Sequence, residues 1–177
     1  MSKQELDVFG YLEAFYGLLQ KPGALLVTEG WDGRANVMAI GWAHVGVLWS
    51  EPIMMVYVRP SRHSYTLLEQ VRQFTVNTAT RDMARAVGLC GTVSGRDEDK
   101  FAAAGLTAAA AQKVKPPVIK ECILHYECNV LHYHDMVREN MHRKVIDSKY
   151  PGGDFHRIFY GEIVACYGEV EELEAGS

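Results

Sequence analysis

The sequence predicts a mainly β protein, an antiparallel barrel with a few helices inserted between its strands. Short segments rich in β-branched and apolar residues recur along the chain, and Gly, Asp or Pro separates them. One of these segments, Ile53–Val58, is apolar on both faces, as in a central strand covered from both sides. The helical segments are few and do not alternate with the strands, which argues against a sheet built from βαβ units.

Length and composition indicate one globular domain spanning residues 1–177, with 1–10 and 170–177 as loosely held ends. Hydrophobic residues make up 48% of the chain and charged residues 23%, which excludes disordered and low-complexity classes. The formal net charge of −4 argues against a nucleic-acid partner bound through bulk charge. The apolar runs are far shorter than a membrane span, so we expect no membrane partner.

The cysteines and histidines predict buried thiols and no metal site. The spacing of Cys90, Cys122, Cys128 and Cys166 contains no Cys-x-x-Cys pair. His132 and His134 share a predicted strand face with Cys128, but Cys128 and His132 lie ~13 Å apart along such a strand. The first residues, Met-Ser-Lys-Gln-Glu-Leu-Asp, are too acidic for a secretory signal, so we expect a cytoplasmic protein.

The first half of the chain is expected to hold two helices and several strands. Residues 11–20 predict a helix that Lys21-Pro22-Gly23 ends. Ser61 is placed to cap a second helix that runs to about Val71. The strands predicted in this half are residues 24–28, 35–42, 53–59 and 74–78.

The second half predicts short helices followed by two long strands. Residues 82–93 show a weak helical pattern, and Asp97 is placed to cap a brief helix that Gly105 ends. In the predicted strand 122–134 the even-numbered positions are the more apolar, so we expect them to face the core. The last predicted strand is 156–167.

The segment Arg59-Pro-Ser-Arg-His-Ser64 links a predicted buried strand to a predicted helix. Pro60 ends the strand, and two arginines and two hydroxyls gather at the first helical turn. That turn has unpaired N–H groups and a partial positive charge, so the segment is suited to binding a phosphate. The alternative is an ordinary capped helix whose arginines are solvated.

Two further segments are suited to a nucleotide. Residues 90–101 (CGTVSGRDEDKF) place glycines around Ser94, a pattern typical of an anion-binding turn, and Lys100 can add a cation. Residues 34–42 (RANVMAIGW) carry small residues at alternate positions, which would let a flat ligand approach the backbone. The alternatives are a plain turn before a capped helix and an ordinary core strand.

These segments occur together with others in the order of a known family. The chain contains, in sequence, Asn36-Val37-Met38-Ala39, Arg59-Pro60-Ser61-Arg62-x-Ser64, Phe74-Thr-Val-Asn77, Gly91-x-x-Ser94-Gly95-Arg96-x-x-Asp99-Lys100-Phe101 and His156-x4-Gly161-Glu162. In these motifs it resembles the flavin reductase-like family of FMN-binding split barrels, and most of all the flavoredoxin branch. The resemblance covers residues 20–168.

The resemblance implies an antiparallel split β-barrel of Greek-key type. It also implies a homodimer, with one non-covalent FMN near the subunit interface of each protomer. The residues that it assigns to FMN are Asn36, Val37, Met38 and Ala39 for the ring, Arg59, Ser61, Arg62 and Ser64 for the phosphate, and Cys90, Ser94 and Lys100 in and beside a loop that closes over the cofactor. Arg59→Ala is accordingly expected to weaken FMN binding by about 1.5 to 3 kcal/mol.

The resemblance also implies NAD(P)H-dependent reduction of flavin or of another small electron acceptor, by hydride transfer to flavin N5. Its catalytic candidate is His156, near the nicotinamide side of the flavin, unless a neighbour merely satisfies this histidine. Family members often have Asp directly before it, whereas this chain has Phe155, with Asp154 one position earlier.

Two other functions stay open at the level of sequence. One is a flavoredoxin-type electron carrier that a protein partner reduces, without an NAD(P)H site of its own. The other is a binding module that keeps the barrel and has lost flavin. We interpret the tryptophans as core residues, with Trp42 and Trp49 as candidates for a dimer interface.

Overall fold

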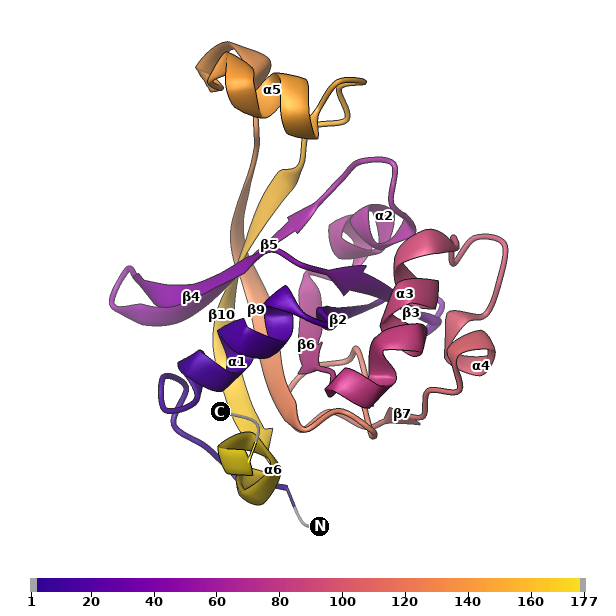
Figure 1. Cartoon of the computed structure of the whole chain (residues 1–177), viewed down its shortest axis with the longest axis vertical. Coiled ribbons are helices and arrows are strands. Elements are labelled where there is room, and N and C mark those ends of the chain that lie inside the picture. Colours follow the sequence, from indigo (N-terminus) through magenta and orange to yellow (C-terminus); the bar gives the residue numbers. More distant parts are fainter. Residues whose placement is uncertain (1–2, 176–177) are drawn as a thin grey trace.

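The computed structural model describes residues 3–175 and contains an antiparallel sheet of eight strands. The strands run in the order β3-β2-β6-β9-β10-β5-β4, with β1 added to β10 (Figure 1). Their bounds are β1 Gln4–Glu5, β2 Ala24–Glu29, β3 Ala35–Ile40, β4 Ala43–Leu48, β5 Glu51–Val58, β6 Gln73–Thr78, β9 Leu124–Asp135 and β10 Arg157–Gly168. The predicted fold class, mainly antiparallel β with inserted helices, is confirmed.

The two edge strands of this sheet follow each other in the chain. β3 ends at Ile40 and β4 begins at Ala43, although they lie at opposite ends of the strand order. The sheet therefore curls to bring its two edges together at Gly41 and Trp42. A separate two-stranded sheet pairs β7 (Ala108–Ala109) with β8 (Val118–Ile119) within the region predicted as a surface connection.

The core packs around β9 and β10, which pair with each other over most of their length. The aromatic side chains of Phe15, Phe74 and Phe159 are fully buried in it. Gly161 of β10 has no room for a side chain, since a Cβ there would lie 2.6 Å from the Phe74 ring and 2.8 Å from the Cβ of Cys128. The four cysteines are free and buried, as predicted.

The helices lie between strands. α1 (Leu12–Gln20) precedes β2, α2 (His63–Gln70) joins β5 to β6, and α3 (Ala84–Thr92) and α4 (Lys100–Ala104) follow β6. Figure 1 shows α2, α3 and α4 on the side of the molecule that holds β3. The 3-10 turns are η1 (Arg81–Met83) and η2 (Arg138–Asn140).

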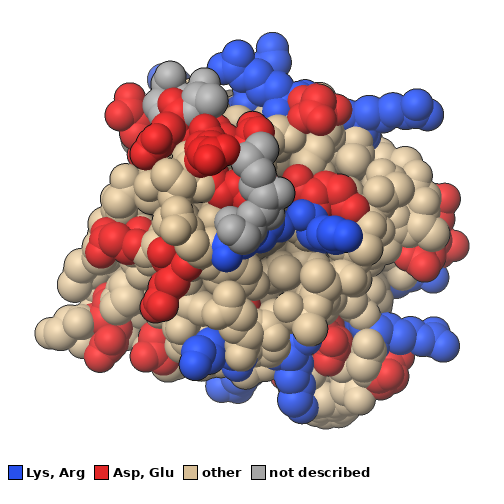
Figure 2. All heavy atoms as spheres, turned by 90° about the horizontal axis from the view of Figure 1, so that it is seen from below, with Lys and Arg blue, Asp and Glu red and all other residues tan. Residues whose placement is uncertain are grey.

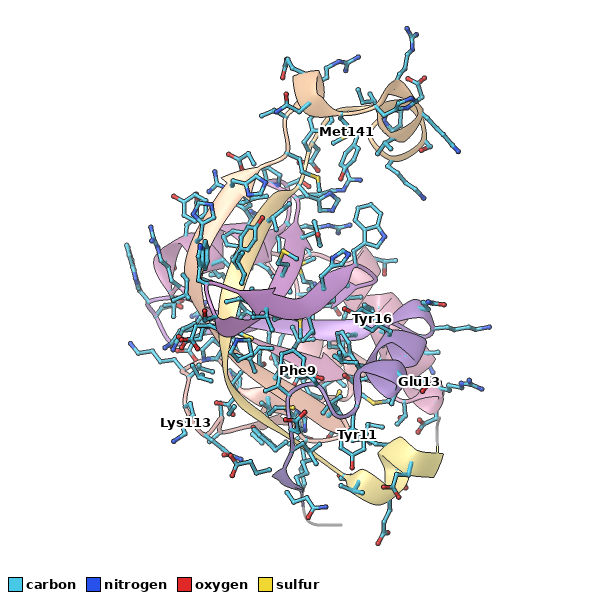
Figure 3. All side chains as sticks on the ribbon, turned by 90° about the vertical axis from the view of Figure 1, so that its left-hand side faces the viewer. Phe9, Tyr11, Glu13, Tyr16, Lys113 and Met141 are labelled. Atoms are coloured by element: carbon cyan, nitrogen blue, oxygen red, sulfur yellow. The ribbon has the colours of Figure 1, made fainter. Side chains whose placement is uncertain are left out.

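A segment that we call the arm, residues 136–156, projects from the ends of β9 and β10. It contains η2 and α5 (Arg143–Lys149), and Figure 1 shows α5 standing clear of the sheet. Met141 lies in the arm, beyond the ends of the strands (Figure 3). At the base of the arm, Arg157 donates to both carboxylate oxygens of Asp135, at 2.6 and 2.9 Å, and to Glu69 of α2 at 2.8 Å. These bonds hold the arm to the body of the protein.

The start of α4 differs from the prediction by two residues. Asp99, not Asp97, caps this helix, and its carboxylate accepts from the N–H groups of residues 101 and 102. Asp97 lies instead in the preceding turn, where its N–H donates to the carbonyl of Ser94. Gly105 ends the helix at φ 66°, as predicted.

Both ends of the chain are better ordered than the sequence predicts, as far as the structure describes them. β1 pairs with the end of β10, and α6 (Val170–Ala175) buries Leu173. Figure 3 shows Phe9, Tyr11 and Tyr16 on the side of the molecule where α1 lies. The Tyr16 hydroxyl accepts a hydrogen bond from Val45 N at 2.9 Å, which joins α1 to β4. Of the predicted loose ends, residues 1–2 and 176–177 lie outside the described part.

β4 is a strand that the sequence analysis does not predict. It pairs with β5 through a tight turn in which Trp49 and Ser50 have φ of 56° and 64°. Two-residue hairpins of this kind are usually signalled by Asn or Gly, so the sequence gives no sign of this turn.

The prediction that the tryptophans fill the core is wrong. Their exposed fractions are 80% for Trp31, 42% for Trp42 and 56% for Trp49. The even face of β9 is buried as predicted from Leu124 to Val130, but both faces are exposed further along, where the strand leads into the arm.

The surface carries both signs of charge. Figure 2 shows Lys and Arg side chains interspersed with Asp and Glu on one face of the molecule. Among residues 3–175, no helix is long and apolar enough to cross a membrane. The same described residues contain no group of three or more His, Cys, Asp or Glu side chains that could hold a metal ion.

Candidate functional site

The candidate site lies along the outer edge of β3. β2 pairs with one edge of this strand, and within residues 3–175 its other edge has no strand partner. Backbone N–H and C=O groups on an unpaired edge are available to a ligand. Two adjoining cavities lie beside β3, and both are lined by Met38, Ala39 and Arg62.

The first cavity, which we call the cationic cavity, has a volume of about 110 Å³. The hydroxyl and cationic side chains that line it are Ser61, Arg62, Ser64, Thr92, Ser94 and Lys100. Lys100 is only 5% exposed, and its Nζ donates to the Cys90 carbonyl at 3.0 Å. Burial lowers the pKa of Lys100, and the nearby Arg62 lowers it further, so an anion bound here would favour the charged amine.

The polar wall of the cationic cavity joins segments that are distant in sequence. Asn36 Nδ2 donates to Ser64 Oγ at 2.8 Å, and both side chains are buried. Gly95 lies directly against Asn36, since a Cβ on Gly95 would be 1.8 Å from Asn36 Oδ1. The structure therefore brings together the three segments that the sequence singled out, 34–42, 59–64 and 90–101.

His63, at the start of α2, adds a polar atom that lacks a partner. Its Nδ1 is buried without a hydrogen bond, an arrangement that costs free energy until a ligand or a water binds there. Burial lowers the pKa of His63, and the positive charges of Arg96 and Lys100 lower it further. Cationic groups thus converge on this end of the site.

The second cavity, which we call the aromatic cavity, has a volume of about 210 Å³ and lies beside the end of β3. Its lining residues are Met38, Ala39, Ile40, Gly41, Trp42, Tyr57, Arg59, Arg62 and His156. The Trp42 and His156 rings lie 5.0 Å apart between centroids. The lining thus combines apolar and aromatic side chains, which suit a flat ring, with two arginines and a histidine.

His156 is held by the arm. Its Nδ1 lies 2.8 Å from the hydroxyl of Tyr150, which is 2% exposed. Burial lowers the pKa of His156 to about 4, and the positive charges of Arg59 and Arg62 act in the same direction. The imidazole is therefore neutral at pH 7, with Nδ1 engaged by Tyr150 and Nε2 left for a ligand.

Arg59 and Ser61 line the cavities, as predicted for a site, but their side chains are hydrogen-bonded to the arm. Arg59 donates to the carbonyls of Lys149 and Asp154 at 2.9 and 3.0 Å. Ser61 does not cap α2, which begins after Arg62 without a side-chain cap, and its hydroxyl donates to Asp154 Oδ2 at 2.6 Å. The carboxylate and carbonyls of the arm are close enough to take these donors, and charged bonds of this kind are strong.

The side chains on one face of β3 pack mostly against α3. Val37 is completely buried and packs with Val87 and Cys90 of α3, and Ala35 and Ala39 are partly buried against the same cluster. Ala39 still lines both cavities, so a ligand would approach the backbone along the edge of the strand. Only the backbone of Val37, and not its side chain, is then available to it.

Residues 16–175 match the family model described as "Flavin reductase like domain". The chain belongs to the flavin reductase-like family. It is 32% identical over 162 residues to an uncharacterised protein of Pyrococcus abyssi, covering 91% of this chain and 82% of that protein. A flavoredoxin from Methanosarcina acetivorans superposes with a TM-score of 0.66 at 28% identity, covering 82% of this chain and 67% of that chain.

A third comparison supports the fold. An FMN-binding domain of a flavin reductases-like enzyme from Shewanella baltica superposes with a TM-score of 0.69 at 17% identity, covering 99% of this chain and 82% of that chain. The family predicted from the motifs and its split-barrel fold are confirmed, and the family supports flavin binding by this chain.

The residues present fit a flavin nucleotide. Neither cavity alone reaches the ~300 Å³ of a typical ligand site, but they meet at Met38 and Ala39 of β3 and at Arg62, which precedes α2. The cationic cavity offers cations, hydroxyls and the unpaired His63 Nδ1 to a phosphate, and the aromatic cavity offers aromatic and apolar side chains to a ring. The edge of β3 lies between them and offers backbone groups to polar ring atoms.

The sequence named most of the residues that line these cavities. Those that it assigned to FMN and that line one or both cavities are Asn36, Met38, Ala39, Arg59, Ser61, Arg62, Ser64, Cys90, Ser94 and Lys100. It assigned no role at the site to His63, the variable position of the arginine motif, or to Tyr57 of β5. It also missed Tyr150, because the arm follows no pattern in the sequence that marks it as part of a site.

Proposed function

We propose that this chain binds FMN non-covalently in the two cavities and acts as an NAD(P)H:acceptor oxidoreductase. When bound, FMN supplies the chemistry, accepting a hydride from the nicotinamide at N5 and passing the electrons to a small molecule or a protein. The observation that supports this most strongly is the junction of a cationic and an aromatic cavity along an unpaired strand edge in a flavin reductase-like chain.

In this proposal, each group of side chains has a role set by its position along the site. Arg62 and Lys100, with the hydroxyls of Ser64 and Ser94, hold the phosphate. Backbone N–H groups along the free edge of β3 donate to the pyrimidine end of the ring, where negative charge develops on reduction. His156, neutral and fixed by Tyr150, lies at the ring end and positions the nicotinamide.

The proposal is tested by adding FMN to the purified protein and mixing the complex with NADH or NADPH without oxygen. We expect stoichiometric yellow protein with an absorbance band near ~450 nm, and loss of that band within the turnover time of an enzyme. If the purified protein binds no flavin, the proposal is wrong, and the third hypothesis, a binding module that has lost flavin, is supported.

The second candidate is a flavoredoxin-type electron carrier, which a protein partner reduces. The observation that favours it is that Trp42 packs against His156, the candidate for placing a nicotinamide, with 5.0 Å between the ring centroids. FMN-loaded protein that neither nucleotide bleaches, but that a reduced ferredoxin-like protein does, would support the carrier.

We also propose that the protein is a homodimer that uses the tip of the β4–β5 hairpin. The exposed fractions there are 68% for Val47, 38% for Leu48 and 56% for Trp49, an unusual amount of apolar surface at one turn. Trp49 also lies near the rings of the exposed His132 and the half-buried Tyr160. Sedimentation equilibrium should give a dimer for the native chain and a monomer for Trp49→Ser; a native monomer would refute the proposal.

A further inference from the structure

Tyr57 of β5 lines the aromatic cavity, and the proposed function gives it no role. Its side chain is half-buried, and its hydroxyl lies 3.0 Å from Nδ1 of His44 on the neighbouring strand β4. His44 pairs with Met55, which shares a face of β5 with Tyr57, so both rings lie on one face of the two strands. The hydrogen bond therefore joins a residue of the cavity to one outside it.

His44 connects this hydrogen bond to the solvent. Its side chain is exposed, and the imidazole meets the Tyr57 ring edge to face, with 5.6 Å between the centroids. An imidazole can both take up and give up a proton near neutral pH. A proton can therefore pass from water to His44, and from His44 to the Tyr57 hydroxyl at the wall of the cavity.

The cationic and imidazole side chains of the same cavity are poor proton donors. The guanidinium groups of Arg59 and Arg62 hold their protons too strongly to act as acids. His156 is already neutral at pH 7, because burial lowers its pKa to about 4. Of the described residues that line this cavity, Tyr57 is therefore the one best suited to supply a proton.

The Tyr57 hydroxyl keeps its proton until an acceptor takes it. Burial raises the pKa of Tyr57, and the nearby Tyr160, Tyr150 and Tyr16 raise it further. A phenol of this kind donates a hydrogen bond to a carbonyl oxygen and transfers its proton when negative charge develops there. Aromatic walls beside such a donor suit a flat compound with carbonyl oxygens, which is the chemistry of a quinone.

We propose that Tyr57 is the catalytic proton donor to a quinone acceptor, and that His44 positions the Tyr57 hydroxyl and returns its proton. The inference rests on the proposed function, because the reduced flavin supplies the hydride. The hydride brings two electrons and a proton to one quinone oxygen, the Tyr57 proton goes to the other, and the products are hydroquinone and oxidised flavin. The Tyr57 oxygen then takes a proton from His44, which takes one from water.

The test compares two oxidants of the FMN-loaded protein after reduction with dithionite, which makes the result independent of NAD(P)H. A substituted benzoquinone takes a hydride and a proton, whereas ferricyanide takes one electron and no proton. In Tyr57→Phe we expect oxidation by the quinone to slow about 100-fold, a usual contribution of a general acid, and oxidation by ferricyanide to change less than twofold. Tyr160→Phe is the matched control, because it removes a tyrosine–histidine bond outside the cavity.

His44→Ala tests the second part of the proposal. It should slow oxidation by the quinone about tenfold and leave oxidation by ferricyanide unchanged. Added imidazole should restore most of the quinone rate, because a free imidazole can return the proton in place of the missing ring. A rate that imidazole does not restore would overturn the role assigned to His44.

A further measurement needs no turnover. Calorimetric titration of the quinone into the oxidised, FMN-loaded protein should show binding about three- to tenfold weaker in Tyr57→Phe than in the native chain, the usual effect of losing one neutral hydrogen bond. Unchanged quinone affinity, an unchanged quinone rate, or equal slowing with both oxidants would overturn this inference and leave the proposed function intact. Failure of the native chain to bind FMN would instead refute the proposed function.

Discussion

The two ends of the candidate site are built in different ways. The cationic cavity is formed by β3, the start of α2 and the loop before α4, and its polar groups include a His63 Nδ1 with no partner. The aromatic cavity is lined by β3, β5 and, from the arm, His156, and two of its polar groups are hydrogen-bonded to the arm. Arg59 donates to arm carbonyls, and Tyr150 binds His156.

We infer from this difference that one cavity mainly sets the affinity for a flavin nucleotide and the other mainly sets the reactions of the bound flavin. In the cationic cavity, Lys100 and Arg62 donate only to backbone carbonyls, and His63 Nδ1 has no partner. A phosphate would make stronger, charged bonds with these cations, so we expect this cavity to supply most of the binding free energy. Side chains that are already hydrogen-bonded to other protein groups gain little free energy from a ligand, but they hold fixed positions around it. We therefore expect the aromatic cavity to control what a bound flavin reacts with.

The largest effect is expected at the cationic end, for Lys100→Met. Loss of a buried charge that holds a phosphate should weaken FMN binding about 10- to 100-fold, because charged hydrogen bonds contribute about 1.5 to 3 kcal/mol. The measurement is a flavin titration. Riboflavin, which has no phosphate, is the control and should lose less than threefold. An equal loss for riboflavin would mean that Lys100 only supports the loop through the Cys90 carbonyl, and Arg62→Gln would then test the cavity independently.

The next largest effect is expected on the free energy of unfolding, through His156 in the aromatic cavity. The pKa of His156 is about 4 in the folded protein against ~6.5 in the unfolded chain, so between these values the unfolded state binds more protons. The stabilisation from the neutral ring is complete above pH 6.5 and is lost as the pH falls toward 4. We expect a loss of about 1 to 2 kcal/mol at pH 5, measured by urea unfolding.

His156→Gln is the comparison for that experiment. It should flatten the dependence of the unfolding free energy on pH between 6.5 and 5. A residual slope is expected from His125, whose pKa burial lowers to about 3. An identical slope in the variant and the native chain would show that His156 is not the titrating group.

A smaller effect is expected for Tyr150→Phe, which removes the hydrogen bond to His156. FMN affinity should change less than twofold, while the rate of bleaching by NAD(P)H should fall about tenfold and its pH dependence should shift. Tyr160→Phe is the matched control, because it removes a tyrosine–histidine bond of 3.3 Å on the outer face. Equal rates in both variants would deny Tyr150 a positioning role and would favour the electron carrier.

The smallest effect is expected on FMN affinity when Arg59 is replaced, in contrast to Arg62 of the same motif. Arg59→Ala should weaken FMN binding less than threefold, below the 1.5 to 3 kcal/mol that the motif suggests, because its guanidinium is engaged by the arm. The same variant should make residues 136–156 more sensitive to limited proteolysis. A loss in Arg59→Ala as large as that in Arg62→Ala would show that both arginines bind the phosphate.

Much of the site was predictable because its parts are local. Gly95, Ser94 and Lys100 lie within a few residues of one another, and the chemistry of a turn depends on such short spacings. The order of several such motifs then identified the family, whereas the burial of both faces of β3, one of them packed on α3, became clear only in the structure. The hairpin turn at Trp49 and Ser50 was not predictable, because neither residue is a usual turn former.

By itself the sequence determined the fold class, the family and the segments that carry chemistry, since these depend on residue type and short spacing. The tertiary structure alone decided where the donors point. Arg59 and the carbonyl of Asp154 that it binds are 95 residues apart, and His156 of the arm meets Trp42, which follows β3, across more than a hundred residues of chain. A hydrogen-bond donor takes whichever acceptor the folded chain places nearest, and no spacing in the sequence records that distance.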